Sequence, residues 1–165
     1  MDRESVAYLL EHPERFHGLP KRSEFEREIC LWVLPSFEPH SSWSIFRDRK
    51  TKEYFVRRLE HDPKRGLPSN MDIYGADAPI SENLATEVLV TFEEIQAPMF
   101  RRLSRIGLDG TSYGVHMGNS WQNTTVRWWS SFSPEWSSLH ELFLATSQRL
   151  DGLLPTSTLR HHEPA

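Results

Sequence analysis

The sequence predicts an α+β fold, with an antiparallel sheet of about five or six strands and two main helices packed on one face. Residues 113–117 and 124–130 alternate apolar with small or polar side chains, which is the period of a half-buried strand. Residues 81–96 and 133–152 instead repeat their apolar side chains at helical spacing. These two periodicities, with the Asp109-Gly110 turn dipeptide ahead of the strands, carry the assignment.

Length and composition are those of one domain. The chain has 165 residues, of which 38% are hydrophobic and 12% aromatic, so it can bury a substantial core. We expect a single domain over residues 1–154 and a flexible tail over residues 155–165. The net charge of −4 argues against non-specific binding to nucleic acid or to a membrane surface.

Cysteine content and hydropathy limit the class of protein further. Cys30 is the one cysteine, which excludes an internal disulfide and a zinc site built from cysteines. The charged N-terminus is not followed by a long apolar run, so it does not resemble a signal peptide. The longest apolar stretch, Ile29–Leu34, is far shorter than the roughly 20 residues of a membrane-spanning helix. We expect a cytoplasmic protein that does not associate with membranes.

The first predicted elements are a short helix and a buried strand. Apolar spacing predicts a helix over residues 3–12, ending before Pro13 because the residue ahead of a proline disfavours the helical conformation. Residues 13–27 are charged and irregular, which predicts a loop that can include a helical turn near its end. Residues 29–34 are apolar on both faces and precede Pro35, which favours a buried central strand.

A hairpin and a long connection are predicted next. Residues 43–46 and 54–59 have alternating apolar positions on either side of a charged segment, so we expect a β-hairpin with a charged tip. Residues 62–80 contain three prolines and two glycines, and we interpret them as a connection whose length suggests a role. Within it, Asp72 and Asp77 are interpreted as turn residues in preference to a cation site.

Both long helices have recognisable ends. Ser81 is expected to cap the helix over 81–96 by accepting a backbone N–H bond, and Pro98 ends this segment. Ser133 and Pro134 are expected to begin the last helix, with serine as the cap and proline at the first helical position. Gly152 is expected to close that helix.

Residues 107–129 are the segment around which we expect the fold to be organised. Asp109-Gly110 starts the first strand, and the residues around Gly118 form a turn or open loop into the second. Because successive side chains of a strand point to opposite faces, Trp128 and Trp129 cannot face the same way. One face is covered by helices, so the tryptophan on the other face is either buried under another element or exposed.

An exposed tryptophan beside an arginine has the composition of a protein-interface hot spot. Core packing of the same residues remains an equal alternative. The side chains that we expect to contact a partner are Asp109, His116, Trp121, Arg127 and Trp129, together with Arg57 of the charged hairpin.

Charge is distributed unevenly along the chain. Residues 47–65 contain eight basic and four acidic residues, whereas residues 66–98 contain six acidic residues and no basic one. A charged partner can be steered by such a surface. The alternative, which we favour, is that the hairpin carries solvated charges that protect its edge against aggregation.

Catalytic, metal and nucleotide motifs are absent or weak. Asp109 and His116 could form a minimal acid–base pair, but no serine or cysteine has the context of a nucleophile. The histidines lack the spacing of a zinc site, and neither of the two glycine-rich phosphate-binding motifs is present. We expect no cofactor and no metal.

The segment Gly107–Tyr113, followed by Trp128-Trp129 and a helix that begins at Pro134, resembles small uncharacterised bacterial proteins. Similar proteins are often encoded alone or near toxin systems, where some look like immunity proteins. The resemblance covers roughly the C-terminal third and implies an α+β fold, without an established activity or catalytic residues.

The leading hypothesis is therefore a non-enzymatic protein-binding module. An immunity-like protein of a bacterial toxin system is one form that such a module can take. It would use the uncovered sheet face around His116, Arg127 and Trp129 with the charged hairpin. One alternative is a small-ligand or hydrolytic pocket around Asp109 and His116. The other is weak nucleic-acid binding through residues 47–65, which the acidic net charge disfavours.

Overall fold

Seven strands form one antiparallel sheet in the order β6-β5-β1-β2-β3-β4-β7 in the computed structural model, which describes residues 3–19, 25–62, 72–98, 109–119, 121–130 and 132–161. The α+β prediction is confirmed, but the described sheet is larger than the five or six strands expected. The helices are α1 (Arg3–Glu11), α2 (Glu82–Glu93) and α3 (Ser137–Leu153), and the strands are β1 (Phe25–Pro35), β2 (His40–Asp48), β3 (Tyr54–His61), β4 (Ile73–Ile80), β5 (Thr111–Gly118), β6 (Asn123–Trp129) and β7 (Arg160–His161).

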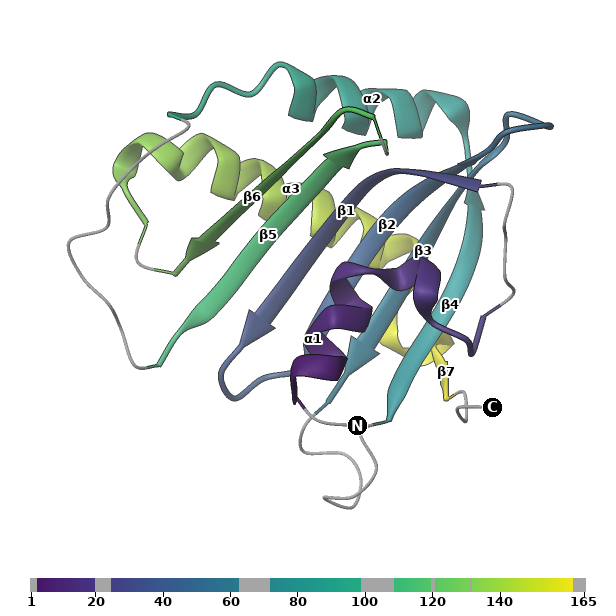
Figure 1. Ribbon diagram of the computed structural model, residues 1–165, viewed down its shortest axis with the longest axis horizontal. Coiled ribbons are helices and arrows are strands. Elements are labelled where there is room, and N and C mark those ends of the chain that lie inside the picture. Colours follow the sequence, from purple (N-terminus) through teal and green to yellow (C-terminus); the bar gives the residue numbers. More distant parts are fainter. Residues whose placement is uncertain are drawn as a thin grey trace.

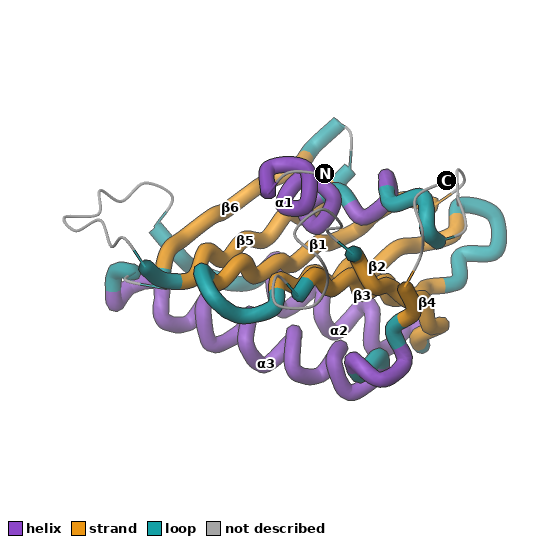
Figure 2. Tube along the Cα trace, turned by 90° about the horizontal axis from the view of Figure 1, so that it is seen from below, coloured by secondary structure: helices purple, strands orange, loops and turns teal. Residues whose placement is uncertain are grey.

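The sheet separates two helical layers. Helices α2 and α3 lie on one face, and α1 lies on the other, as the two perpendicular views show (Figure 1 and Figure 2). Alternation along each strand explains this arrangement, because one set of side chains meets α2 and α3 while the next meets α1. The chain therefore has two separate cores.

The larger core lies between the sheet and helices α2 and α3. Ser81 caps α2 as predicted, since its hydroxyl accepts a hydrogen bond of 3.2 Å from the Leu84 backbone N–H. The buried strand residues of this core include Ile29, Leu31, Trp43, Ile45, Val56, Val115 and Trp128, and the buried helix residues include Ala85, Val88, Phe92, Leu139, Phe143 and Leu150.

The smaller core lies beneath α1. Val6 and Leu10 pack against a group of side chains from β3, β4 and the segment after α1, namely Phe16, Leu19, Leu59 and Ile73. Arg27 of the sheet also binds the last residue of this helix, donating to the Glu11 carbonyl at 2.9 Å, and Arg57 donates to the Pro13 carbonyl just beyond it at 3.1 Å. Cations near the C-terminal carbonyls of a helix stabilise it, so α1 is held by charge as well as by apolar contact.

The prediction that residues 62–80 form a connection is wrong for its second half, because Ile73–Ile80 is the strand β4. Gly75 allows close packing: a Cβ there would lie 2.7 Å from Leu59 Cδ2. Asp77 is not a turn residue either, since it lies opposite Arg57 and binds its guanidinium. The glycine and the aspartate thus serve packing and an ion pair within a strand.

The C-terminal segment also differs from expectation. Helix α3 continues through Gly152 to Leu153, and Ser133 bonds the Glu135 carboxylate instead of capping the backbone. Residues 155–161 of the expected tail belong to the fold, because Leu159 is 6% exposed and β7 pairs with β4. The burial of Leu159 explains why this segment is ordered onto the sheet edge; residues 162–165 lie outside the described residues.

Candidate protein-binding surface

β6 forms one edge of the sheet, and among the described residues it pairs only with β5. Two backbone bonds flank this ladder, from Ser130 N–H to the Thr111 carbonyl at 2.8 Å and from Asn119 N–H to the Gln122 carbonyl at 2.9 Å. Hydrogen-bonded and non-hydrogen-bonded pairs alternate in an antiparallel ladder. The register therefore directs the backbone N–H and C=O groups away from β5 at Asn123, Thr125, Arg127 and Trp129.

The opposite edge of the sheet is better protected. β7 pairs with β4 at Tyr74 and Gly75, and Pro79 on β4 has no N–H to offer. Natural sheets protect their edges with short strands and prolines of this kind. β6 has no proline and is rich in β-branched and aromatic residues, so the described sheet has one protected edge and one edge with outward backbone groups.

Trp121 stands at the turn between β5 and β6 and is 94% exposed. The Asn119 side chain accepts hydrogen bonds from the backbone N–H groups of Trp121 at 2.8 Å and Gln122 at 3.1 Å. Gly118 has a φ of 107°, which glycine adopts without steric cost. A large aromatic side chain is thus presented to solvent beside the open edge.

Trp128 and Trp129 point to opposite faces of the sheet, as their adjacency in a strand requires. Trp128 is 5% exposed in the larger core, where it stacks on Tyr113 with ring centroids 5.7 Å apart. Trp129 is half-buried on the α1 face, and a Cβ at Gly110 would lie 2.6 Å from its indole nitrogen. Only part of the Trp129 ring is therefore available to a partner.

Arg127 lies on the same face, and α1 covers this part of the face only partly, since the Arg127 side chain remains 58% exposed. Its guanidinium pairs with the Glu11 carboxylate of α1 at 2.5 Å and lies over the Trp32 ring, 5.5 Å from the centroid. Trp32 is buried because Gly114 on β5 leaves room for its ring. The sequence did not reveal this contact because residues 11, 32 and 127 lie far apart along the chain.

His116 and Asp109 are not brought together. His116 is half-buried and its Nδ1 lies 2.8 Å from the Thr125 hydroxyl. Burial is the main cause that lowers the His116 pKa below its usual value of 6.5, and the nearby Arg27 and His12 add to the shift. Asp109 is exposed and precedes β5, whose extended residues from Thr111 to His116 alone span about 16 Å at about 3.3 Å per residue. An acid–base pair between them is excluded by this geometry.

Arg57 is an interior residue and cannot contact a partner directly. It is 3% exposed, and its guanidinium binds both oxygens of Asp77, at 2.8 and 2.9 Å. Arg58 is 5% exposed and pairs with Glu60 at 2.8 Å and with Asp151 at 3.0 Å. Two charges of the basic hairpin are therefore neutralised inside the fold; residues 64 and 65 lie outside the described part of the chain.

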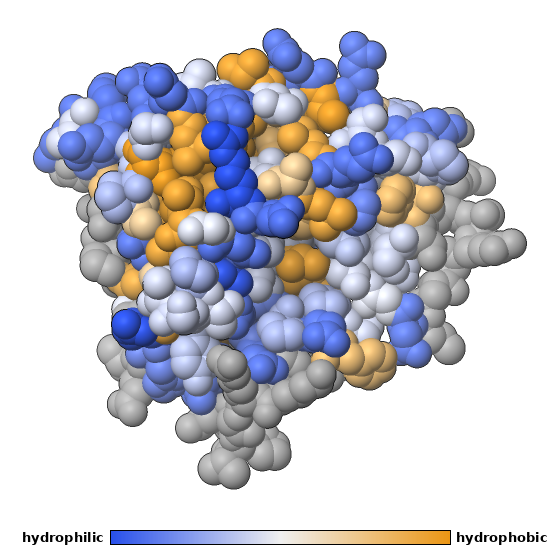
Figure 3. Space-filling model, turned by 180° about the vertical axis from the view of Figure 1, so that it is seen from behind, coloured by the Kyte–Doolittle hydropathy of each residue, from blue (hydrophilic) through white to orange (hydrophobic). Residues whose placement is uncertain are grey.

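A groove of about 950 Å³ lies beside the β6 edge on the face that carries α2. One wall of the groove is formed by the last turn of α2 and the residues that follow it, and the other wall is formed by the β5–β6 hairpin. Trp136 and Leu139, at the start of the last helical segment, also line the groove. Figure 3 looks onto this helix-covered face, where hydrophobic side chains form a broken patch among hydrophilic ones. The apolar residues of the lining include Leu89, Phe92, Ile95, Ala97, Pro98, Val115, Met117 and Val126.

Glu28 and Glu93 are the acidic residues of this lining, and Arg127 is its basic residue. Glu28 is the unpaired residue where the register of β1 against β2 shifts, which leaves its side chain at the groove. Sequence reasoning missed both glutamates because a β-bulge and the end of a helix bring them together. The apolar residues Ile95, Ala97 and Pro98, at and just beyond the end of the predicted helix, were the one available signal.

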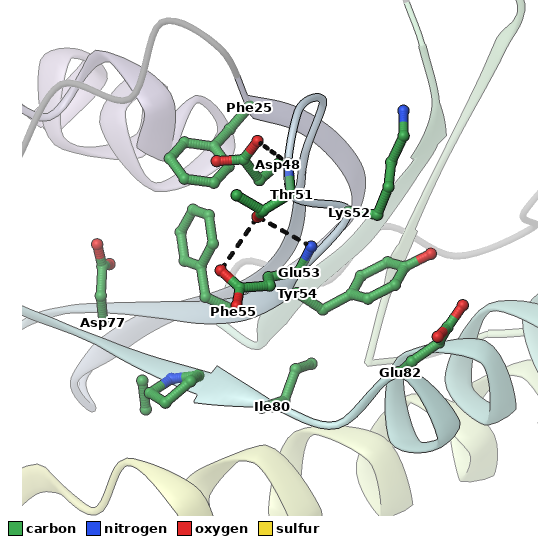
Figure 4. Close-up of a pocket in the computed structure, with 12 residues that line it drawn as sticks. Phe25, Asp48, Thr51, Lys52, Glu53, Tyr54, Phe55, Asp77, Ile80 and Glu82 are labelled. Atoms are coloured by element: carbon green, nitrogen blue, oxygen red, sulfur yellow. Dashed lines mark hydrogen bonds between the residues drawn. The ribbon is translucent and has the colours of Figure 1, made fainter.

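A second cavity of about 520 Å³ lies near the tip of the β2–β3 hairpin (Figure 4). Its polar groups already serve local structure. The Asp48 carboxylate accepts hydrogen bonds from the backbone N–H groups of Lys50 and Thr51, and Thr51 also donates to Glu53. These bonds define a turn, so we do not place the binding site here.

Within the described residues, no group of three histidine, cysteine, aspartate or glutamate side chains is arranged to hold a metal ion. None of the helices in the described part of the chain has the length and apolar character needed to cross a membrane. No protein-family model matches the chain, and no curated protein and no solved structure matches it either.

Proposed function

We propose that this protein binds a protein partner by adding an extended segment of that partner to the β6 edge. The observation that carries the proposal is the set of backbone groups at Asn123, Thr125, Arg127 and Trp129 that point away from β5. A peptide strand placed alongside can satisfy these groups with main-chain hydrogen bonds. The pairing would give affinity, and the side chains on either face would give specificity.

Trp121 supports the same surface. Tryptophan is enriched among the residues that dominate binding energy at protein interfaces, and this one is 94% exposed beside the edge. Phe37, in the β1–β2 connection, is also exposed, at 65%. It provides a matched aromatic control, since it belongs to a different strand connection.

The immunity-like role is the biological setting that we propose for this binding. It rests on the resemblance of the C-terminal third alone, and the partner would then be a toxin of the same bacterium. Co-expression with toxins encoded beside the gene tests it directly, with survival of the cells as the measurement. Survival that is independent of this protein would remove the immunity role and leave the binding proposal standing.

The experiment for the binding proposal is affinity capture from the native host with two substitutions at one position. Thr125→Pro removes the outward N–H without removing a hydrogen bond to β5, whereas Thr125→Ala keeps that N–H. Both variants lose the Thr125 hydroxyl bond to His116, so they differ mainly in the edge donor. We expect the wild type and Thr125→Ala to capture the same protein and Thr125→Pro to lose it.

Two further measurements keep this test decisive. Thermal unfolding shows whether each variant is folded, and hydrogen exchange of the wild-type complex shows whether β6 amides become protected. Trp121→Ala should weaken capture, while Phe37→Ala should leave it unchanged. Equal capture by the folded Thr125→Pro and Thr125→Ala variants, or protection confined to other strands, would overturn the proposal.

A further inference from the structure

We infer that the groove between α2 and the β5–β6 hairpin selects a partner segment that is apolar and carries one lysine or arginine. The inference rests on the proposed function, because it describes what accompanies the strand added at β6. It follows from the position of the groove, from its apolar lining and from the charged residues in that lining.

The groove adjoins the proposed strand site. In β6, residues on the α2 face alternate with the outward-bonding residues on the α1 face, and Thr124 and Val126 of the α2 face line the groove. Side chains of an added strand alternate in the same way. Every second side chain of the partner segment would therefore face the groove, where Pro98 and Trp136 form apolar surface.

The charges in the lining favour a basic side chain. Within the described residues, neither Glu28 nor Glu93 forms an ion pair, whereas Arg127 is already paired with Glu11. The Glu28 pKa is raised, mainly by burial and next by the negative charge of Glu26. Arg47 acts in the opposite direction and lowers this pKa, and Glu93 raises it by less than Arg47 lowers it. A cation placed between Glu28 and Glu93 would relieve the burial cost and the repulsion together.

Length also favours lysine or arginine over a small cation. β1 is the third strand from the edge, and adjacent strands are about 4.8 Å apart, so the backbone at Glu28 lies about 14 Å from that of an added strand. Among the natural side chains, only lysine and arginine are long enough to approach the Glu28 carboxylate over that distance. Long side chains place their aliphatic part against apolar surface and extend the charged end to a polar group. Glu93 lines the same groove from the end of α2, which forms one of its walls.

The test is selection of random peptides displayed on phage against the immobilised full chain, followed by affinity measurements on synthetic peptides. We expect the enriched peptides to share apolar residues at alternate positions and one lysine or arginine. Replacing that basic residue by norleucine should weaken binding about tenfold, the effect of losing one partly desolvated charge pair. Binding of the basic peptide should also weaken as salt increases.

Substitutions in the protein complete the test. The double variant Glu28→Gln and Glu93→Gln should lose about tenfold in affinity for the basic peptide and little for its norleucine form. Glu94→Gln is the matched control, because Glu94 is exposed next to Glu93 and does not line the groove. Equal affinities for both peptides, or an equal loss with Glu94→Gln, would overturn the inference.

The outcomes also separate this inference from the proposed function. Peptides that bind Thr125→Ala but not Thr125→Pro, and that ignore Glu28 and Glu93, would support strand addition and overturn the basic-residue inference. Failure to enrich any peptide that depends on the Thr125 N–H would overturn strand addition, and the inference with it. Self-association of the wild type that is lost in Thr125→Pro would assign the edge and groove to a second copy of this chain and also overturn the inference.

Discussion

Replacing Gly114 by alanine tests the packing of Gly114 in β5 against Trp32 in the neighbouring strand β1, on the α1 face of the sheet. A Cβ at this position would lie 2.1 Å from both Cε2 and Cζ2 of Trp32, whereas carbon atoms in contact are ordinarily about 3.5–4.0 Å apart. Trp32 is 1% exposed and has the Arg127 guanidinium over its ring. Because the ring is almost fully buried, it cannot move aside without losing contacts. We therefore expect Gly114→Ala to lower the free energy of unfolding by about 3 kcal/mol, the upper end of the cost of overpacking.

Gly152 supplies the matched control for the same chemical change. It lies in the last turn of α3, and a Cβ there would meet nothing within 4 Å. Alanine is the better helix former, so Gly152→Ala should raise the free energy of unfolding by about 0.5 kcal/mol. Urea unfolding followed by tryptophan fluorescence measures both variants.

The two substitutions should therefore differ in sign. A Gly114→Ala variant within about 0.5 kcal/mol of the wild type would refute the reasoning, because the Trp32 ring would then be free to move. A double-mutant cycle with Trp32→Leu adds a second criterion. Since the clash involves the indole, the cost of Gly114→Ala should shrink when the indole is removed.

Three other residues give predictions that can be checked on the purified protein. Asp77→Ala leaves the buried Arg57 guanidinium without the Asp77 carboxylate, so it should lower the free energy of unfolding, measured in urea, by about 3 kcal/mol. A loss no larger than that of an exposed surface substitution would contradict the buried ion pair. The pKa of His116 is lowered in the folded state, so its contribution to stability is present above pH 6.5 and is lost as the pH falls through the folded-state pKa. The variant His116→Gln should therefore show a smaller decline of Tm on acidification than the wild type. An identical decline in both proteins would contradict this prediction. Burial raises the pKa of Cys30 to about 12, so the thiol should react with a thiol reagent at pH 8 only when the chain unfolds, and rapid labelling of the folded protein would show that it is accessible.

Local patterns in the sequence were sufficient for most of the individual elements. The first helix ends before Pro13, Ser81 caps α2, and alternation places Trp128 and Trp129 on opposite faces. Each of these depends on forces between residues a few positions apart, such as steric exclusion before proline or a serine hydroxyl bonded to a backbone N–H. Such forces act the same way wherever the segment lies in the fold.

The proposed site was predicted only in part. Trp121 was singled out from the sequence, and it is exposed on the turn beside β6. Arg57 was assigned to the surface because its hairpin is rich in charge, but it is buried against Asp77. The groove and its glutamates, Glu28 and Glu93, could not be found from spacing, since a bulge in β1 and the end of α2 supply them separately.

The sequence by itself determined the strand alternation, the end of α1 before Pro13 and the Ser81 cap of α2, because these are set by side chains that are neighbours along the chain. Only the tertiary structure decided that residues 73–80 form a strand, that α1 reaches Arg127, and that β6 is an open edge while the C-terminal segment pairs with β4 at Tyr74 and Gly75. Each of these depends on contacts between distant segments. The free energy of such contacts comes from burial and pairing across the sheet, which no local periodicity contains.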